Sequence, residues 1–237
     1  MNLAVAQVAT RILSQYGIPI CIIGELVLNY YNVPRICHDL EICVPTSDID
    51  RATDILCTTG HFEPWEVRDS FNNYTEYRRG FPCIRTTGWI NPPQIVAIFT
   101  ASFYNLEPIE KILIPATTRL KAYISKEMAD TNARDIASLH LPRLAPFLKG
   151  LAKRFIDHED DVAMIAVEQL VDGMNLNDAW VDANLGDCQT DVLNLIRNQI
   201  RGKESRKDHF SGNKITCFVK DEAEATVIQQ IAGFNCR

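Results

Sequence analysis

The sequence lacks the features that place a protein in a membrane or outside the cell. Its apolar runs, such as residues 18–23, are far shorter than the roughly 20 residues that span a bilayer. The N-terminus has no basic cluster followed by an apolar stretch, and Arg11 interrupts the first apolar pattern, so it does not resemble a secretory signal. We therefore expect a cytoplasmic protein without a membrane segment.

Basic residues are too few for general binding to nucleic acid. The 237 residues include 24 Lys and Arg against 30 Asp and Glu, which gives a formal net charge of −6. Proteins that bind nucleic acid in bulk use Lys and Arg to neutralise phosphates and release counterions. The 46% of hydrophobic residues instead indicate a globular chain with one large core, or a core and a helical appendage.

The eight cysteines lack the paired Cys-x-x-Cys spacing that zinc sites usually show. Cys21, Cys43, Cys83 and Cys217 all have Ile or Phe neighbours. Free Cys packs as a small hydrophobic residue, so we expect buried thiols rather than zinc ligands or disulfides.

Several catalytic motifs are missing. The chain has no Gly-x-x-x-x-Gly-Lys-Ser/Thr loop, no Gly-x-Gly-x-x-Gly turn, no Gly-x-Ser-x-Gly elbow and no His-Glu-x-x-His helix. Cys37 and His38 are neighbours, but consecutive strand residues point to opposite faces, which disfavours a nucleophilic pair. The acidic residues 157–161 are more typical of a helix N-terminus than of a calcium loop.

Hydrophobic periodicity predicts an α+β fold for residues 1–140 and an all-helical domain for residues 141–237. Thr46 or Ser47 is the expected N-cap of the third helix. In the first domain we expect helices over 3–16, 25–31, 47–58, 117–128 and 132–140, strands over 18–23, 39–44 and 112–115, and several antiparallel strands between 61 and 103. In the second we expect helices over 144–156, 160–171, 176–184, 190–201 and 222–231, with a mobile polar loop over 202–214.

Residues 22–44 carry the strongest indication of chemistry. Gly24 ends a strand, a helix follows at once, and the next strand begins with Asp39 and Glu41. Residues i and i+2 of a strand share a face, so these two carboxylates lie side by side and repel each other unless a cation lies between them. Oxygen ligands completed by water and phosphate suit Mg²⁺. Gly24 lets a phosphate approach the backbone at the start of the helix.

The segments Ile23-Gly24-Glu25 and Asp39-Leu40-Glu41-Ile42 resemble the signature of the nucleotidyltransferase superfamily, which has a polymerase beta-like fold. Their surroundings are also similar to uncharacterised fungal members of this superfamily. Residues 134–139 are more weakly similar to a late helix of antibiotic- and toxin-type nucleotidyltransferases. The resemblance implies a mixed sheet flanked by helices, followed by an all-helical C-terminal region.

The resemblance further implies a Mg²⁺-dependent enzyme. Such an enzyme binds a nucleoside triphosphate and transfers a nucleotidyl group to a hydroxyl of a small molecule or protein. It implies that Asp39 and Glu41 are catalytic and hold Mg²⁺, and that the turn at Gly24 and Glu25 contacts the triphosphate.

Four basic residues could contact phosphate. Arg35 and His38, just before the carboxylates, either bind phosphate or cap a loop. Arg78 and Arg79 either contact a phosphate or face solvent, and solvent is the more usual environment for such arginines.

Two positions differ from the superfamily pattern. Glu25 replaces a small residue and brings a negative charge to the expected phosphate site. The third carboxylate of the family is missing from residues 94–100, so Glu76 or Asp69 would have to supply it. These differences favour an alternative function, a catalytically degenerate nucleotide-binding or protein-interaction module whose helical C-terminal part contacts a partner.

Overall fold

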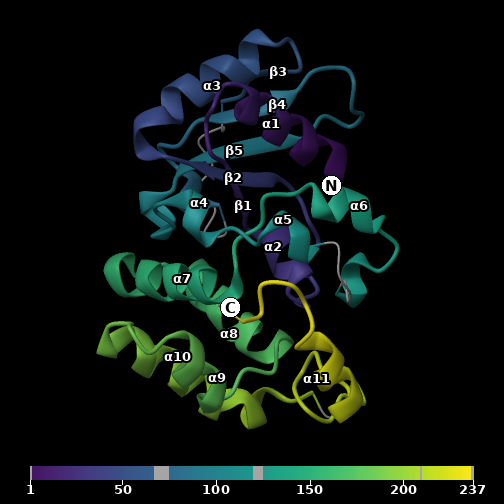
Figure 1. Ribbon diagram of the computed structural model, residues 1–237, viewed down its shortest axis with the longest axis vertical. Helices are drawn as coiled ribbons and strands as arrows, with labels where there is room; N and C mark the ends of the chain where they lie inside the picture. The colour runs from purple at the N-terminus through teal and green to yellow at the C-terminus, as the bar shows by residue number, and fades with distance from the viewer. Residues whose placement is uncertain (1, 67–74, 120–124, 209, 236–237) are drawn as a thin grey trace. The chain divides into compact units, whose positions relative to one another are not determined.

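A computed structural model describes residues 2–66, 75–119, 125–208 and 210–235 (Figure 1). It confirms an α+β protein with a mixed sheet and a helical C-terminal region. Among the described residues, no helix is both long and apolar enough to cross a bilayer. Contacts divide the chain into two compact units: unit 1, with Met1–Val27, Ile36–Leu113 and Arg134–Pro142, and unit 2, with Leu28–Arg35, Ile114–Ala133 and Arg143–Arg237.

Unit 1 is built on a five-stranded sheet with the order β1-β2-β5-β4-β3. β2 and β5 are parallel, and the other neighbouring pairs are antiparallel. The prediction of antiparallel strands between residues 61 and 103 is therefore correct, because β4 pairs antiparallel with both β3 and β5. The strands are β1 (Cys21–Ile23), β2 (Leu40–Val44), β3 (Phe62–Pro64), β4 (Cys83–Thr86) and β5 (Ile95–Thr100).

The strand β2, which lies between β1 and β5, is buried on both faces. Its alternation of polar and apolar residues predicts one buried face, but all five of its residues are buried. The helices α1 (Leu3–Gln15) and α3 (Ile49–Thr58) pack on each other, and α3 also packs on β3 and β5. Glu41 in β2 is consequently held in a low-dielectric environment, where its charge needs a partner.

In the first half of the chain, the predicted N-cap of the third helix and the predicted strand over 112–115 are wrong. The helix expected from residue 47 begins with a 3₁₀ turn, η1 (Thr46–Asp48), and Asp48 is the N-cap of α3 without a side-chain cap bond. The expected strand over 112–115 is absent, because α4 (Ile109–Ile112) ends there and Leu113 forms only an isolated bridge to Pro142.

The helices expected over 117–128 and 132–140 are shorter than predicted. The structure has α5 (Ala116–Arg119), the 3₁₀ turn η4 (Lys126–Met128) and α6 (Ala133–Ala137). Residues 120–124 lie outside the described residues. Two further 3₁₀ turns of unit 1 are η2 (Glu76–Arg78) and η3 (Ser102–Tyr104).

The predicted C-terminal helices are confirmed, with ends shifted by a few residues. α7 packs on α8, and α10 packs on both of them and on α9. The helices are α7 (Leu144–His158), α8 (Asp161–Gly173), α9 (Asp178–Asn184), α10 (Thr190–Gly202) and α11 (Glu222–Ile228).

The acidic stretch 157–161 includes a helix cap, as predicted. Asp160 is the N-cap of α8 and accepts a hydrogen bond from the Ala163 amide at 3.1 Å. Its other oxygen accepts hydrogen bonds from Arg154, which is only 2% exposed. The cap therefore also neutralises a buried arginine of α7.

The loop expected over 202–214 is ordered at its start. It begins with the 3₁₀ turn η5 (Lys203–Arg206). Arg206 donates to both oxygens of Asp172 at 2.8 Å, and Cys217 donates to the same carboxylate at 3.3 Å. Three of the described cysteines, Cys21, Cys43 and Cys83, are buried.

Candidate functional site

Gly24 forms the corner between β1 and the short helix α2 (Glu25–Tyr30). Its φ of 68° is left-handed, a conformation that costs glycine little. The preceding residue, Ile23, pairs with Glu41 across the β1–β2 ladder. A Cβ on Gly24 would lie 2.2 Å from Oε2 of Glu41. The corner therefore needs glycine both for its backbone conformation and for room beside this carboxylate.

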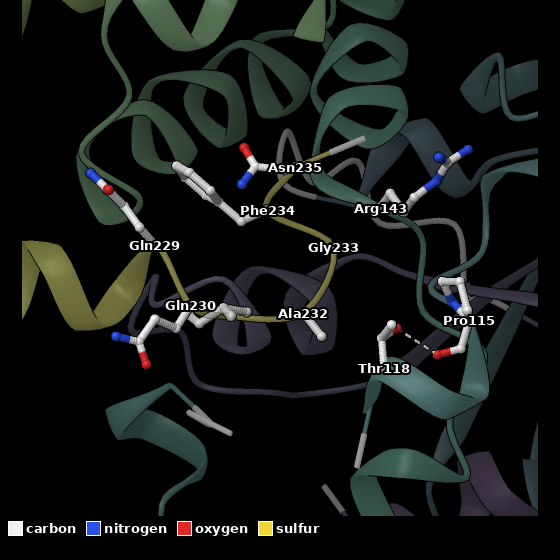
Figure 2. A pocket seen from close by; sticks show the side chains of 10 residues that line it. Pro115, Thr118, Arg143, Gln229, Gln230, Ala232, Gly233, Phe234 and Asn235 are labelled. Carbon is white, nitrogen blue, oxygen red and sulfur yellow. Dashed lines mark hydrogen bonds between the residues drawn. The ribbon is translucent and has the colours of Figure 1, made fainter. Parts of the chain in front are cut away.

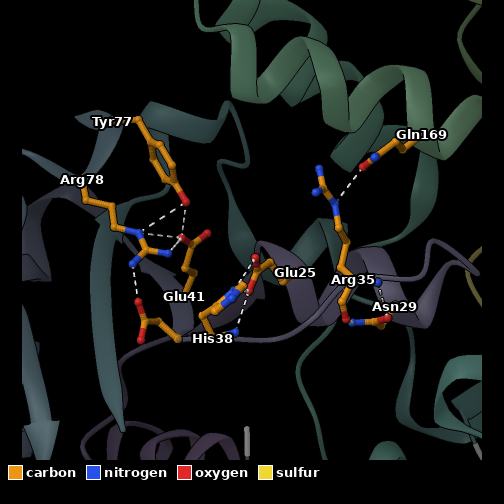
Figure 3. A network of polar contacts seen from close by, with 9 residues as sticks. Glu25, Asn29, Arg35, His38, Glu41, Tyr77, Arg78 and Gln169 are labelled. Atoms are coloured by element: carbon orange, nitrogen blue, oxygen red, sulfur yellow. Dashed lines mark hydrogen bonds and ion pairs between the residues drawn. The ribbon is translucent and has the colours of Figure 1, made fainter. Parts of the chain in front are cut away.

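Asp39 and Glu41, called the acid pair below, share the guanidinium of Arg78 (Figure 3). Nη1 of Arg78 lies 2.5 Å from Oδ2 of Asp39. Its Nη2 and Nε lie 2.7 Å and 3.0 Å from Oε1 of Glu41. The two carboxylates thus lie side by side, and the chain itself supplies the cation that they need.

Tyr77 completes the cluster by donating its hydroxyl to Oε1 of Glu41. Glu41 is 3% exposed and the Arg78 side chain 11%. Burial lowers the pKa of Arg78, but the charge of Glu41, the interactions with Tyr77 and the hydrogen bond to Asp39 together outweigh burial and raise this pKa above its usual value. Burial and the charge of Glu41 both raise the pKa of Tyr77. Arg78 therefore stays charged and Tyr77 neutral across the physiological pH range.

The acid pair has the donor chemistry of a site for one small divalent cation. Mg²⁺ commonly takes one or two carboxylates from a protein and completes its shell with water and phosphate oxygens. The carboxylates of Asp39 and Glu41 already meet at one positive group. They fit a metal ion, provided that it replaces the guanidinium of Arg78.

A third metal ligand is missing from the part of the chain that the structure describes, where no three His, Cys, Asp or Glu side chains form a group able to hold a metal ion. β5 places Ala97 opposite Glu41. Glu76, one of the two substitutes expected from the sequence, pairs with Arg79. The other, Asp69, lies outside the described residues. A two-metal site is therefore not formed by these residues.

Glu25 and His38 contact each other. Oε2 of Glu25 accepts the backbone N–H of His38 at 2.8 Å, and its Oε1 lies 3.2 Å from Nδ1 of the imidazole. The His38 side chain is 68% exposed. Glu25 thus fixes the loop before β2, and His38 has one of the two roles expected for it, a loop contact.

Arg35 belongs to unit 2 and stabilises a loop there. Its backbone N–H donates to Oδ1 of Asn29 at 3.0 Å, and the Asn29 amide donates to the Arg35 carbonyl at 2.8 Å. Nε of Arg35 donates to Gln169 on α8 at 2.9 Å (Figure 3). Of the two roles expected for Arg35, the structure shows the loop contact.

Sequence reasoning names Arg78 only for phosphate contact or solvent exposure, and it does not identify Tyr77. Solvent is the expected environment of both neighbouring arginines, which is correct for Arg79, 55% exposed, and wrong for Arg78. The one signal in the sequence is electrostatic, because a like-charge pair needs a cation. That signal does not identify Arg78, which lies 37 residues after Glu41.

Unit 2 contains a hollow of about 370 Å³ (Figure 2), lined mainly by residues 229–235. Two polar contacts at its wall are made within the chain: the Leu144 amide donates to the Gly233 carbonyl at 2.9 Å, and the Thr118 hydroxyl to the Pro115 carbonyl at 2.8 Å. No Asp or Glu is among its lining residues. The acid pair of unit 1 is therefore the stronger candidate for metal-dependent chemistry.

The sequence matches no protein-family model, and no curated protein matches it. One solved structure that matches is the solution structure of the antibiotic-resistance factor ANT(2'')-Ia. The TM-score is 0.38 at 9% identity, over 86% of this chain and 91% of that chain. A TM-score of this size does not establish a common fold.

Proposed function

We propose that the protein is a nucleotidyltransferase-like enzyme. It binds a nucleoside triphosphate with Mg²⁺ and transfers a nucleotidyl group to a hydroxyl of a small molecule or protein. The observation that supports this proposal is the convergence of Asp39 and Glu41 on one cation position beside the glycine corner at Gly24. The resemblance of these residues to the superfamily signature supports it independently of the geometry.

In this proposal each residue has a separate task. Asp39 and Glu41 hold Mg²⁺, which when bound polarises phosphate oxygens and the acceptor hydroxyl. The corner at Gly24 contacts the triphosphate through its backbone, and its missing side chain leaves room for the Glu41 carboxylate. His38 is exposed and can reach a phosphate from solvent, whereas the Arg35 side chain is tied to Gln169.

Titration calorimetry with ATP, CTP, GTP and UTP, each with and without Mg²⁺, tests the binding step. We expect at least one nucleotide to bind only with Mg²⁺, and Asp39→Asn to abolish this binding. Glu63→Gln is the matched control, because it removes an acidic charge from the same sheet at an exposed pair with Arg85. Binding of none of the four nucleotides to the wild-type protein would overturn the proposal.

Group transfer is tested separately from binding. The nucleotide that binds is incubated with a panel of hydroxyl-bearing acceptors, and release of pyrophosphate is followed. We expect release that depends on an acceptor and is lost in Asp39→Asn. Metal-dependent binding without release from any acceptor would favour the second candidate.

The second candidate is a catalytically degenerate module that binds nucleotide or a protein partner. The observation that favours it is the ion pairing of both carboxylates with Arg78, together with the missing third ligand in the described part of the chain. In such a module the Arg78 guanidinium stays on the two carboxylates permanently. Mg²⁺ then makes no difference to nucleotide binding.

A further inference from the structure

The guanidinium of Arg78 occupies the oxygens that a metal ion would use. It contacts Oδ2 of Asp39 at 2.5 Å and Oε1 of Glu41 at 2.7 Å. The second oxygen of Glu41, Oε2, faces Gly24. A cation bridging the two carboxylates would therefore need Oε1 of Glu41, which Arg78 holds.

Electrostatic repulsion also prevents the Arg78 guanidinium and a divalent metal ion from occupying the acid pair together. The Glu41 carboxylate and the Arg78 side chain are almost fully buried, so water screens their charges poorly. A divalent ion and a guanidinium on the same two carboxylates would repel each other strongly at this depth. One must leave when the other binds.

We propose that Arg78 is an internal competitor of the divalent cation: it neutralises Asp39 and Glu41 in the free protein, and it must leave them before a metal ion can bind. The proposal rests on the proposed function, because it takes Mg²⁺ as the ligand of the acid pair. It adds the way in which access to that pair is regulated.

The competition couples metal binding to nucleotide binding. A metal ion alone displaces Arg78 from both of its carboxylates, which costs the protein this charge-assisted contact. A metal ion with a triphosphate gives the guanidinium new oxygens, because arginine pairs with phosphate in the same forked geometry as with carboxylate. The wild-type protein is therefore expected to bind metal ion and nucleotide cooperatively.

Electron paramagnetic resonance of Mn²⁺ measures the competition without any enzymatic activity. We expect Arg78→Gln to bind Mn²⁺ about tenfold more tightly than the wild-type protein, or better, since couplings of this kind range from about 5-fold to 150-fold. Arg79→Gln is the matched control, because this neighbour pairs with the exposed Glu76; its affinity should be unchanged. Adding Asp39→Asn to Arg78→Gln should abolish the gain.

A second variant, Arg78→Lys, keeps the competition testable if Arg78→Gln does not fold. Arg78→Lys keeps the charge but not the forked geometry, and we expect it to bind Mn²⁺ more tightly than the wild-type protein and less tightly than Arg78→Gln. The melting temperature of both variants should rise with Mn²⁺ more than that of the wild-type protein. Equal Mn²⁺ affinity in the wild-type protein and both variants, or no binding in any of them, would overturn the competition.

The outcomes separate this inference from the proposed function. If the Arg78 variants gain Mn²⁺ binding but no nucleotide binds, the competition is correct and the proposed function is wrong. If the wild-type protein binds Mg²⁺ and nucleotide through Asp39, but the Arg78 variants show the wild-type metal affinity, the function is correct and the competition is wrong.

Discussion

Among single residues, Gly24 is the most constrained position of the candidate site. Gly24 and Gly17 have nearly the same left-handed φ, 68° and 71°, but a Cβ on Gly17 would have no neighbour within 4 Å. Gly17→Ala should therefore cost about 1–2 kcal/mol from backbone strain alone. Gly24→Ala should cost about 1–3 kcal/mol more, because the new methyl group collides with Glu41.

Urea unfolding of the two alanine variants measures this difference. The comparison is matched, since the substitution and the backbone conformation are the same at both positions. Equal losses of the free energy of unfolding would contradict the contact between Gly24 and the Glu41 carboxylate.

Cys217 should react slowly with alkylating reagents. Burial, with the Asp172 charge and hydrogen bond, raises the pKa of this thiol from 9.0 to about 12. The thiolate is the nucleophile, so the rate should still be rising steeply at pH 10 in the folded protein. In the urea-unfolded chain it should level off above pH 9. Iodoacetamide labelling followed by mass spectrometry gives both profiles, and identical profiles would contradict the shift.

The sequence predicts the local part of the candidate site but not the two residues that reach it from a distant segment. Gly24, Asp39 and Glu41 are recognisable because their roles follow from short-range pattern, a turn and a period of two. Arg78 and Tyr77 reach the acid pair only because η2 folds back on β2, which no local pattern encodes. Most arginines are exposed to solvent. Arg78 is buried because it pairs with the buried charge of Glu41.

Among the elements, β5 sets how many carboxylates face the acid pair. Ala97 lies directly opposite Glu41 in the parallel ladder, so its side chain shares that face of the sheet, whereas Val96 lies opposite Leu40 on the other face. Ala97→Asp should lower the melting temperature in EDTA and recover part of the loss with Mg²⁺. Val96→Asp should lose stability without any recovery.

Differential scanning fluorimetry with and without Mg²⁺ measures both variants. Recovery specific to Ala97→Asp indicates that the face beside Glu41 accepts a metal ion once a third carboxylate is present. Equal behaviour of the two variants would contradict a metal-binding role for this face.

The start of α8 depends on Asp160 more than its position at a surface turn suggests. Asp160→Ala removes a helix cap and leaves the buried Arg154 without this carboxylate. The expected loss of stability is about 3–5 kcal/mol, the range for breaking a buried ion pair. Asp157→Ala, which breaks an exposed pair with Lys153, should cost about 0.5 kcal/mol or less. Guanidinium unfolding followed by circular dichroism compares them, and similar losses would contradict the buried pair.

The length of an element decides whether the sequence predicts it. The helices α7, α8 and α10 are amphipathic over more than three turns, so their period of 3.6 residues is clear. Residues 112–115 form a short apolar run, which periodicity does not distinguish from a helix end. In the structure α4 ends at Ile112, and Leu113 makes a single bridge.

At the scale of the whole molecule, the sequence predicts the composition of the fold and not its connections. Alternating strand and helix signals are enough for an α+β class. The parallel pairing of β2 with β5 joins strands about fifty residues apart, and it depends on packing over that distance rather than on any turn. The assignment of residues 28–35 and 114–133 to unit 2 is equally non-local.

A chain cut between residues 140 and 141 tests the domain division expected from the sequence. In unit 2, Asn32 donates to the Gly173 carbonyl at 2.9 Å, and Ser125 donates to the Asn29 carbonyl. A fragment of residues 141–237 loses the segments 28–35 and 114–133, and with them part of its buried surface. We therefore expect each fragment alone to melt below the intact chain and an equimolar mixture to recover cooperative unfolding. Circular dichroism melts measure this, and separate fragments that each melt at the temperature of the intact chain would establish two independent domains.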